Sequence, residues 1–421
     1  MSAKLQSWMC RKAQILKLIY GFTLLPCLVF AGQNAPQLIT NNSVPVTLEV
    51  PNRFTIPITV CVPNTKKCKT IPDVMLDSGS IGLRVYAQDA PSELPLIKNG
   101  NNQTLAQCTT FFGASAWGPQ STADIYIGGN VAKNVPLQII DAKFGSAPKD
   151  CTNLMMKPGS DGLAHGILGI ASDIFIQNQL LTPFTFYSCQ DSSSSSTSVC
   201  NKCGTGLNFN WSSCGPGFPT MPSNWNSISY MSEDSNGWML QIPEAPPLDG
   251  SPKLIGTFTL GVGTRPNNMP PKDINSFPLK NSMSIPVQFQ GKNYFAILDT
   301  GGVTWSFPTS LIDNTGAPVP LCSEDPSYYC PQASLSTHAI VGAAGGSQAD
   351  VQITIVNPKM LSGSAQGLNV IFNDIGKIGP VLPNGLTYFN MGAPFFMGRT
   401  VYQVFYGESV PALGIGPLVA F

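Results

Sequence analysis

Two tripeptides carry residue types that could do acid–base chemistry, one in each half of the 421-residue chain: Asp77-Ser78-Gly79 and Asp299-Thr300-Gly301. Each follows a short apolar run, at 74–76 before the first and at 296–298 before the second. An Asp followed by a hydroxyl residue and Gly is, on its own, a turn signal. Two such carboxylates brought together could share one proton, so that one acts as an acid while the other acts as a base.

The surroundings of the two tripeptides are also duplicated. Partly alternating apolar and polar residues at 54–60 and 284–289 predict a half-buried strand upstream of each Asp. Downstream, two apolar residues and a Gly end 92 positions after Asp77 (Ile167-Leu168-Gly169) and 99 positions after Asp299 (Phe396-Met397-Gly398). The repeat favours a duplicated lobe over two unrelated hairpin turns.

The first 31 residues have the pattern of an export signal. They hold four basic residues and no acidic residue, and an apolar stretch runs over 18–30. This predicts a signal peptide cleaved after Ala31. A membrane anchor would need an apolar run of roughly 20 residues, and Pro26 disfavours a lipoprotein signal at Cys27. We therefore expect an exported protein, periplasmic or secreted, with no stable membrane span after cleavage.

Composition narrows the function classes. Charged residues make up 11% of the chain, and without residues 1–31 the acidic residues exceed the basic ones by four. Nothing in this charge balance suggests nucleic-acid binding, which requires clustered basic residues. The sequence also lacks motifs of two other classes, a Gly-rich phosphate loop and a helical His-Glu-x-x-His motif. About 390 residues with strand signals throughout predict a mostly β protein of two lobes.

Cysteines behind a signal peptide predict disulfides, and ten remain after cleavage: Cys61, Cys68, Cys108, Cys151, Cys189, Cys200, Cys203, Cys214, Cys322 and Cys330. Pairs 61–68 and 322–330 would close short loops, and 108 and 151 are a third candidate pair. The cluster at 189–214 leaves its pairing open. It could ligate zinc, although an oxidising compartment favours disulfides.

Together these residues resemble the pepsin-like aspartic proteases over most of the mature chain, and most of all an uncharacterised bacterial branch of exported proteins. Asp77-Ser78-Gly79-Ser80 is similar to the first catalytic turn, with Ser80 as a hydroxyl beside the first carboxylate. Residues 165–169 are similar to the strand that crosses behind that Asp, and 396–416 to the closing strands.

The resemblance implies an all-β fold, a bilobal double β-barrel with an active-site cleft between the lobes. Residues 32–265 would form the N-terminal lobe, with a Cys/Ser-rich insertion around 187–237. Residues 266–421 would form the C-terminal lobe.

The resemblance also implies an aspartic endopeptidase in which Asp77 and Asp299 hold a water between them. Ser78 and Thr300 would hydrogen-bond across the lobes, while Gly79 and Gly301 would let the backbone approach closely. The substrate would be an extended peptide or protein, bound by a monomer without a metal or another cofactor.

Three positions depart from the family pattern. Phe112-Gly113 stands where the flap over the substrate has a Tyr-Gly pair, and Trp117 would either donate a hydrogen bond from that flap or be a hydrophobic surface anchor. Gly302 replaces a hydroxyl residue, which predicts that Asp299 has no side-chain donor there and that the enzyme works at less acidic pH. Arg84 replaces an apolar residue, and we interpret it as solvated or ion-paired.

Three other readings stay open. Gly302 favours a catalytically weak or inactive pepsin-fold protein that binds or inhibits a partner. A Ser–His hydrolase would have to use His165 or His338, and the sequence has no Gly-x-Ser-x-Gly elbow. A surface-attachment module built on the Ser-rich disulfide loop would leave both Asp turns unexplained.

Overall fold

The computed structural model describes residues 42–111, 114–152, 156, 165–172, 184–190, 199–205, 214–216, 226–245, 253–280, 283–362, 369–379, 381, 385 and 387–421. The predicted signal peptide and the flap residues Phe112 and Gly113 lie outside this part of the chain. No helix within it is long and apolar enough to cross a membrane.

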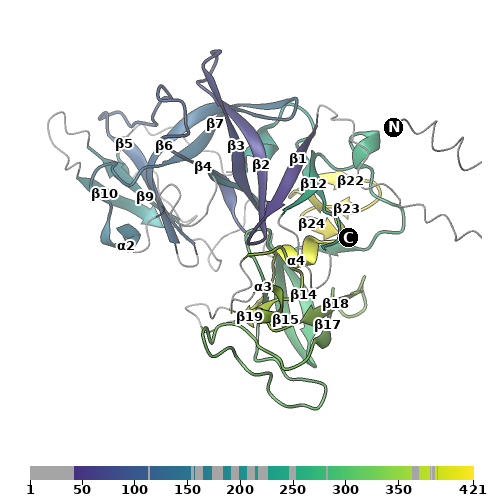
Figure 1. Cartoon of the computed structure of the whole chain (residues 1–421). Helices are drawn as coiled ribbons and strands as arrows, with labels where there is room; N and C mark the ends of the chain where they lie inside the picture. Colours follow the sequence, from purple (N-terminus) through teal and green to yellow (C-terminus); the bar gives the residue numbers. More distant parts are fainter. Residues whose placement is uncertain are drawn as a thin grey trace, which may run out of the picture. The chain divides into compact units, whose positions relative to one another are not determined.

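The described residues form mostly β-strands, which confirms the predicted all-β class (Figure 1). One sheet has 15 strands, in the spatial order β10 (Cys200–Thr205), β9 (Phe184–Cys189), β5 (Thr104–Phe111), β6 (Ala114–Ile127), β7 (Asn130–Ile140), β4 (Ile81–Tyr86), β8 (Gly166–Ile170), β3 (Cys68–Asp77), β2 (Arg53–Cys61), β1 (Ser43–Glu49), β12 (Lys253–Leu260), β11 (Gly237–Gln241), β21 (Thr400–Val404), β24 (Leu418–Ala420) and β13 (Ser276–Pro278). A second sheet has seven, in the order β18 (Ala349–Ile355), β17 (Leu335–Val341), β14 (Ser284–Phe289), β15 (Lys292–Leu298), β20 (Phe389–Met391), β16 (Trp305–Phe307) and β19 (Gly376–Ile378).

The remaining elements within the described ranges are short. Strands β22 (Ser409–Val410) and β23 (Gly414–Ile415) form a two-stranded sheet. The helices are α2 (Lys149–Thr152), α3 (Lys359–Ser362), α4 (Ala393–Phe396) and the 3-10 turns η2 (Ser227–Tyr230) and η3 (Pro266–Asn268).

Local sequence explains the two hairpins that lead to the Asp turns. In β2 and β14 buried residues alternate in part with partly or fully exposed ones, and in β2 the non-buried residues are only partly exposed. Gln290 and Gly291 connect β14 to β15 and both have positive φ, 48° and 73°. That is the backbone of a two-residue hairpin turn, and Gly at its second position accepts it without strain.

The large sheet takes strands from both ends of the chain. Strand β1 pairs with β12, and β11 pairs with β21, which in turn pairs with β24. Three of its strands (β13, β21 and β24) therefore come from beyond residue 265, whereas the seven-stranded sheet is built only from residues 284–391.

A continuous apolar core holds both sheets. It includes Ile56 and Leu76 on the strands that lead to the first Asp, and Ala296 and Leu298 on the strand that leads to the second. In the seven-stranded sheet the Phe289 ring lies 5.3 Å from the rings of both Phe307 and Phe389. Burial of these strands fixes where each Asp turn begins.

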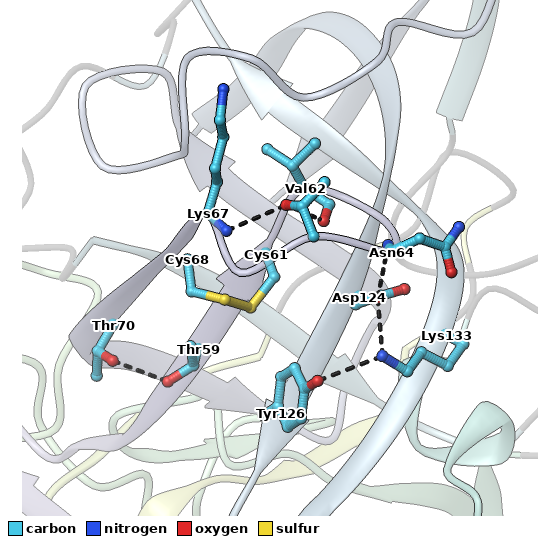
Figure 2. The surroundings of a disulfide bond; sticks show 11 residues. Thr59, Cys61, Val62, Asn64, Lys67, Cys68, Thr70, Asp124, Tyr126 and Lys133 are labelled. Carbon is cyan, nitrogen blue, oxygen red and sulfur yellow. Dashed lines mark hydrogen bonds and ion pairs between the residues drawn. A yellow bond between two sulfur atoms is a disulfide. The ribbon is translucent and has the colours of Figure 1, made fainter.

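Five disulfides join the ten cysteines, as predicted: Cys61–Cys68, Cys108–Cys151, Cys322–Cys330, Cys189–Cys200 and Cys203–Cys214. The last two resolve the pairing that the sequence left open, and they engage all four thiols of the cluster proposed as an alternative zinc site. Cys61–Cys68 closes the tip of the β2–β3 hairpin, where the Asp124 carboxylate also accepts from the backbone NH of Asn64 and from Lys133 (Figure 2).

Candidate active site

Each Asp turn is supported from behind by a parallel strand. Strand β8 pairs with β3 so that Gly169 lies opposite Asp77. In the other half β20 pairs with β15, and the backbone NH of Asp299 donates to the carbonyl of Met391 at 3.0 Å. Gly392, which follows β20, has the same place behind Asp299 that Gly169 has behind Asp77.

The distant apolar pair of the second half is therefore Met391 with Gly392, and the predicted Phe396-Met397-Gly398 is wrong. Gly392 lies 93 positions after Asp299, close to the 92 that separate Gly169 from Asp77. Phe396 instead ends α4, and Met397 makes an isolated bridge with Ile242. The predicted triplet fitted the apolar pattern but lies six residues beyond the one that strand pairing places behind Asp299.

The two carboxyl groups come together at the glycines of the tripeptides. A Cβ added to Gly301 would lie 2.7 Å from Oδ1 of Asp77, and a Cβ added to Gly79 would overlap Oδ1 of Asp299. Glycine is required at both positions because of this close approach. The Asp77 carboxyl is in hydrogen-bond contact with that of Asp299.

Ser78 and Thr300 tie the two turns to each other with four reciprocal hydrogen bonds. The Ser78 hydroxyl donates to the carbonyl of Leu298 at 2.8 Å and accepts from the backbone NH of Thr300 at 2.9 Å. The Thr300 hydroxyl donates to the carbonyl of Leu76 at 2.7 Å and accepts from the backbone NH of Ser78 at 2.8 Å. The residues expected to bond across the halves do so in the structure.

Each carboxylate accepts one backbone and one side-chain donor. Oδ1 of Asp77 accepts from the NH of Gly79 at 2.8 Å, and its Oδ2 from the Ser80 hydroxyl at 2.5 Å. Oδ1 of Asp299 accepts from the NH of Gly301 at 2.9 Å, and its Oδ2 from Nδ2 of Asn390 at 2.6 Å. Position 302 supplies no side-chain donor to Asp299, and Asn390 from β20 supplies one instead.

The two carboxyl groups differ in how deeply they are buried, and therefore in their electrostatic environment. Asp77 is 5% exposed, and Asp299 is half-buried. Burial, with the charge of Asp299 second, raises the pKa of Asp77 to about 7. Lys377 on β19 and Tyr388 before β20 both interact electrostatically with Asp299. Burial lowers the pKa of Lys377 and raises the pKa of Tyr388.

Arg84 is buried behind the first turn, which corrects its interpretation as a solvated or ion-paired residue. Its Nη1 donates to the carbonyls of Ile81 and Gly82 at 2.8 and 3.2 Å, and its guanidinium lies 5.4 Å from the centre of the Phe111 ring. Burial lowers the pKa of Arg84 to about 10, and the charge of Asp77 opposes that shift. The cation is thus close enough to interact with Asp77.

Of the three predicted flap residues, Trp117 is the one that the structure describes, and it is not a free donor. Its side chain is buried, and its indole NH donates to the carbonyl of Phe144 at 2.8 Å. The ring of Tyr187 packs against it edge-on at 5.4 Å. Trp117 is therefore a buried residue that anchors the β5–β6 hairpin from inside, and not the surface anchor expected as its alternative role.

The histidines of the alternative hydrolase are occupied elsewhere. Nδ1 of His165 lies 3.1 Å from Asp89, and Nδ1 of His338 lies 2.9 Å from Asp350 on the neighbouring strand.

Sequence reasoning missed Asn390 and the burial of Arg84. A usable signal for Asn390 was present: a polar residue directly before Met391-Gly392, where the first half has Ile167.

A family model described as "Protein of unknown function (DUF3443)" matches residues 31–421 of the chain. No curated protein matches it. Among solved structures, the chain is similar to the crystal structure of an aspartic proteinase from Irpex lacteus. The two share 15% sequence identity over 90% of this chain and 96% of the other, with a TM-score of 0.45.

Proposed function

The chain belongs to the DUF3443 family, and we propose that it is an exported aspartic-type endopeptidase that hydrolyses peptide bonds with the Asp77–Asp299 dyad. The observation that carries the proposal is the pair of carboxyl groups in mutual contact, each at the end of a buried strand and each held by two donors. Two carboxyl groups this close titrate as one unit and retain one proton over a wide pH range.

In the proposed mechanism the dyad holds one proton and activates one water. Asp77, whose pKa burial raises to about 7, keeps the proton in mildly acidic solution. Asp299, as the carboxylate, takes a proton from the water while its oxygen attacks the peptide carbonyl carbon. Asp77 gives its proton to the carbonyl oxygen. The tetrahedral intermediate then loses its C–N bond: Asp299 passes its proton to the amine nitrogen, and one hydroxyl of the intermediate returns a proton to Asp77, which restores the singly protonated dyad.

The supporting residues have defined tasks in this proposal. Ser78 and Thr300 hold the two turns in register, and Gly79 and Gly301 leave room for the opposite carboxylate. An extended peptide or protein is the proposed substrate. The enzyme would act as a monomer outside the cytoplasm, in line with its disulfides.

A binding or inhibitor protein with a disabled site is the weaker candidate. Its support was Gly302, and Asn390 now provides the donor that Gly302 lacks.

Digestion of an unfolded protein over a pH series tests the proposal. We expect cleavage by the mature protein that rises in mildly acidic solution, is blocked by a pepstatin-type inhibitor and disappears in Asp77→Asn. Asp124→Asn, a change of the same type at the Cys61–Cys68 hairpin, is the matched control and should keep its activity. Cleavage that survives in a folded Asp77→Asn variant would contradict the proposal.

A further inference from the structure

The two halves use different residues to donate a hydrogen bond to Oδ2 of Asp77 and Oδ2 of Asp299. The register that places Ile167 opposite Met75, two residues before Asp77, places Asn390 opposite Ile297, two residues before Asp299. Ile167 and Asn390 are therefore equivalent positions. Ser80 and Gly302 are equivalent as well, because each follows its Asp by three residues.

In each half a different one of these positions supplies the side chain that donates to Oδ2 of the Asp. In the first half the hydroxyl of Ser80 donates to Oδ2 of Asp77, and Ile167 packs into an apolar cluster with Met75. In the second half Gly302 has no side chain, and Nδ2 of Asn390 donates to Oδ2 of Asp299.

The two changes depend on each other sterically. A Cβ on Gly302 would lie 2.8 Å from Oδ1 of Asn390, closer than real Cβ contacts come, and 3.3 Å from Oδ2 of Asp299. Any side chain at 302 would thus displace the Asn390 amide. The φ of Gly302 is not in the left-handed region, so the backbone itself does not require glycine there.

Asn390 is 8% exposed and comes from a strand in the middle of the seven-stranded sheet. An apolar residue would fill this position without the cost of burying an amide. The amide differs from a hydroxyl in one chemical respect: Nδ2 donates and cannot accept, so it favours Asp299 as the carboxylate.

We propose that Asn390 is a positioning residue of the dyad, paired with Gly302, which holds Asp299 ionised and oriented so that the shared proton stays on Asp77. The inference rests on the proposed function and deepens it. The charged and titratable groups that face Asp299 are Asp77 from the opposite turn, Lys377 from β19 and Tyr388 from the residue before β20. Asn390 adds a neutral donor in direct contact with Oδ2 of Asp299.

Exchange of the donor between the two positions tests the pairing. Asn390→Ile removes the donor and copies Ile167, and we expect the acid limb of the pH–rate profile to move to higher pH by about 1–2 units. Gly302→Ser alone should impair hydrolysis because it displaces the amide. The double variant Asn390→Ile with Gly302→Ser restores the arrangement of the first half and should return the acid limb close to the wild-type position.

The position of the acid limb distinguishes positioning from a structural role. Variants that merely loosen the sheet would lower the rate and the stability without moving the limb. An acid limb that stays in place in folded Asn390→Ile, or a double variant worse than either single one, would overturn the proposal. Asn390→Leu, closer in shape to asparagine, serves if the isoleucine variant does not fold.

A second readout does not require activity. In protein labelled with 13C at the aspartate carboxyl carbons, the Asp299 signal is assigned by its loss in Asp299→Asn. The midpoint of the dyad's first deprotonation, followed through this signal, should move to higher pH in Asn390→Ile and return in the double variant. An unmoved midpoint contradicts the role of Asn390. If the wild type cleaves no peptide but the midpoint moves, the proposed function fails while the donor exchange stands.

Discussion

Asp77 and Asp299 accept the same number of hydrogen bonds, yet their surroundings differ. Asp77 is the more deeply buried and has Arg84 behind it, whereas Asp299 is half-buried beside Lys377. Because burial raises the pKa of Asp77 to about 7, the form of the dyad with one proton should persist up to near-neutral pH. The proposed activity is therefore lost as pH rises through about 7.

Arg84→Met tests this electrostatic picture. The guanidinium stabilises the ionised form of Asp77, so its removal should move the upper limb of the pH–rate profile to higher pH by roughly one unit. Arg399→Met is the matched control, since Arg399 also lies over a phenylalanine ring and donates to backbone carbonyls. It should lower stability and leave the limb in place; an equal shift in both variants would remove the role of Arg84.

At this scale the sequence predicted some residues and could not predict others. Asp77, Ser78, Asp299 and Thr300 stand in a duplicated local motif, which makes their relation visible. Asn390 contacts Asp299 across 91 positions; its polar side chain before Met391-Gly392 is a local signal, but only strand pairing shows which residue it contacts. Arg84 lies against the Phe111 ring of β5, and no local pattern in the sequence links these two residues.

Among the elements, the two Asp turns form one unit through the hydroxyls of Ser78 and Thr300. Thr300→Val keeps the shape of the side chain but leaves the Leu76 carbonyl and the Ser78 NH without their partner. We expect a loss of stability of about 2–4 kcal/mol and a large loss of hydrolysis, since two buried backbone groups become unsatisfied.

Thr304→Val is the control for that measurement. Thr304 is buried, and its hydroxyl has no hydrogen-bond partner within the described residues. Chemical denaturation should find this variant as stable as the wild type or more stable. Equal losses in both variants would show that burial of the threonine, and not the reciprocal bonds, holds the turns.

The disulfide at the tip of the β2–β3 hairpin lies far from the candidate active site. Cys68 begins β3 and Asp77 ends it, so the disulfide lies roughly 30 Å of strand away from the carboxylate. Replacement of Cys61 and Cys68 by serine should cost about 2 kcal/mol of stability because the closed loop is short. Hydrogen exchange should increase at the tip while the pH–rate profile stays unchanged. A displaced profile would mean that the tip controls the dyad.

Sequence patterns predicted where strands and hairpins form better than they predicted which strands pair with each other. The hairpins before each Asp follow from alternating residues and turn signals, and three of the five disulfides follow from spacing. The place of Met391-Gly392 did not follow, because Asn390 interrupts the apolar pattern there and Phe396-Met397-Gly398 matches it better.

For the whole molecule, the buried acids set how stability depends on pH. The folded-state pKa values of Asp77 and Asp374 are raised to about 7 and about 6, chiefly by burial, from an ordinary value of 3.8. The folded state thus holds protons that the unfolded state has released. Stability is greatest below pH 4 for these two groups and falls as pH rises, on the order of 1.4 kcal/mol per pH unit for each proton.

Asp77→Asn should flatten the stability curve between pH 6 and 7, where Asp374 has already ionised. Urea denaturation of both proteins at half-unit steps measures the slope. Asp374→Asn should flatten the curve only below pH 6. A slope between pH 6 and 7 that is the same in Asp77→Asn and the wild type would mean that Asp77 has no raised pKa.

The strand order of the large sheet could not be predicted from local sequence patterns, because its strands pair over long distances in the sequence. Strand β1 pairs with β12 across about 210 positions, and β11 pairs with β21 across about 160. Such partners are chosen by burial of the whole sheet, so the sequence predicted two β lobes but not that three strands beyond residue 265 complete the 15-stranded sheet.

The most direct test of the account is the hydrolysis rate of one defined peptide at mildly acidic pH by the wild type, Asp77→Asn and Asp299→Asn, each shown to be folded. A dyad that shares one proton requires both carboxyl groups. We predict that each single variant loses at least about a thousandfold of the rate, and that the double variant loses no more than either one. Hydrolysis retained in either folded single variant, or a wild type that cleaves no peptide at any pH from 3 to 7, would contradict the central claim.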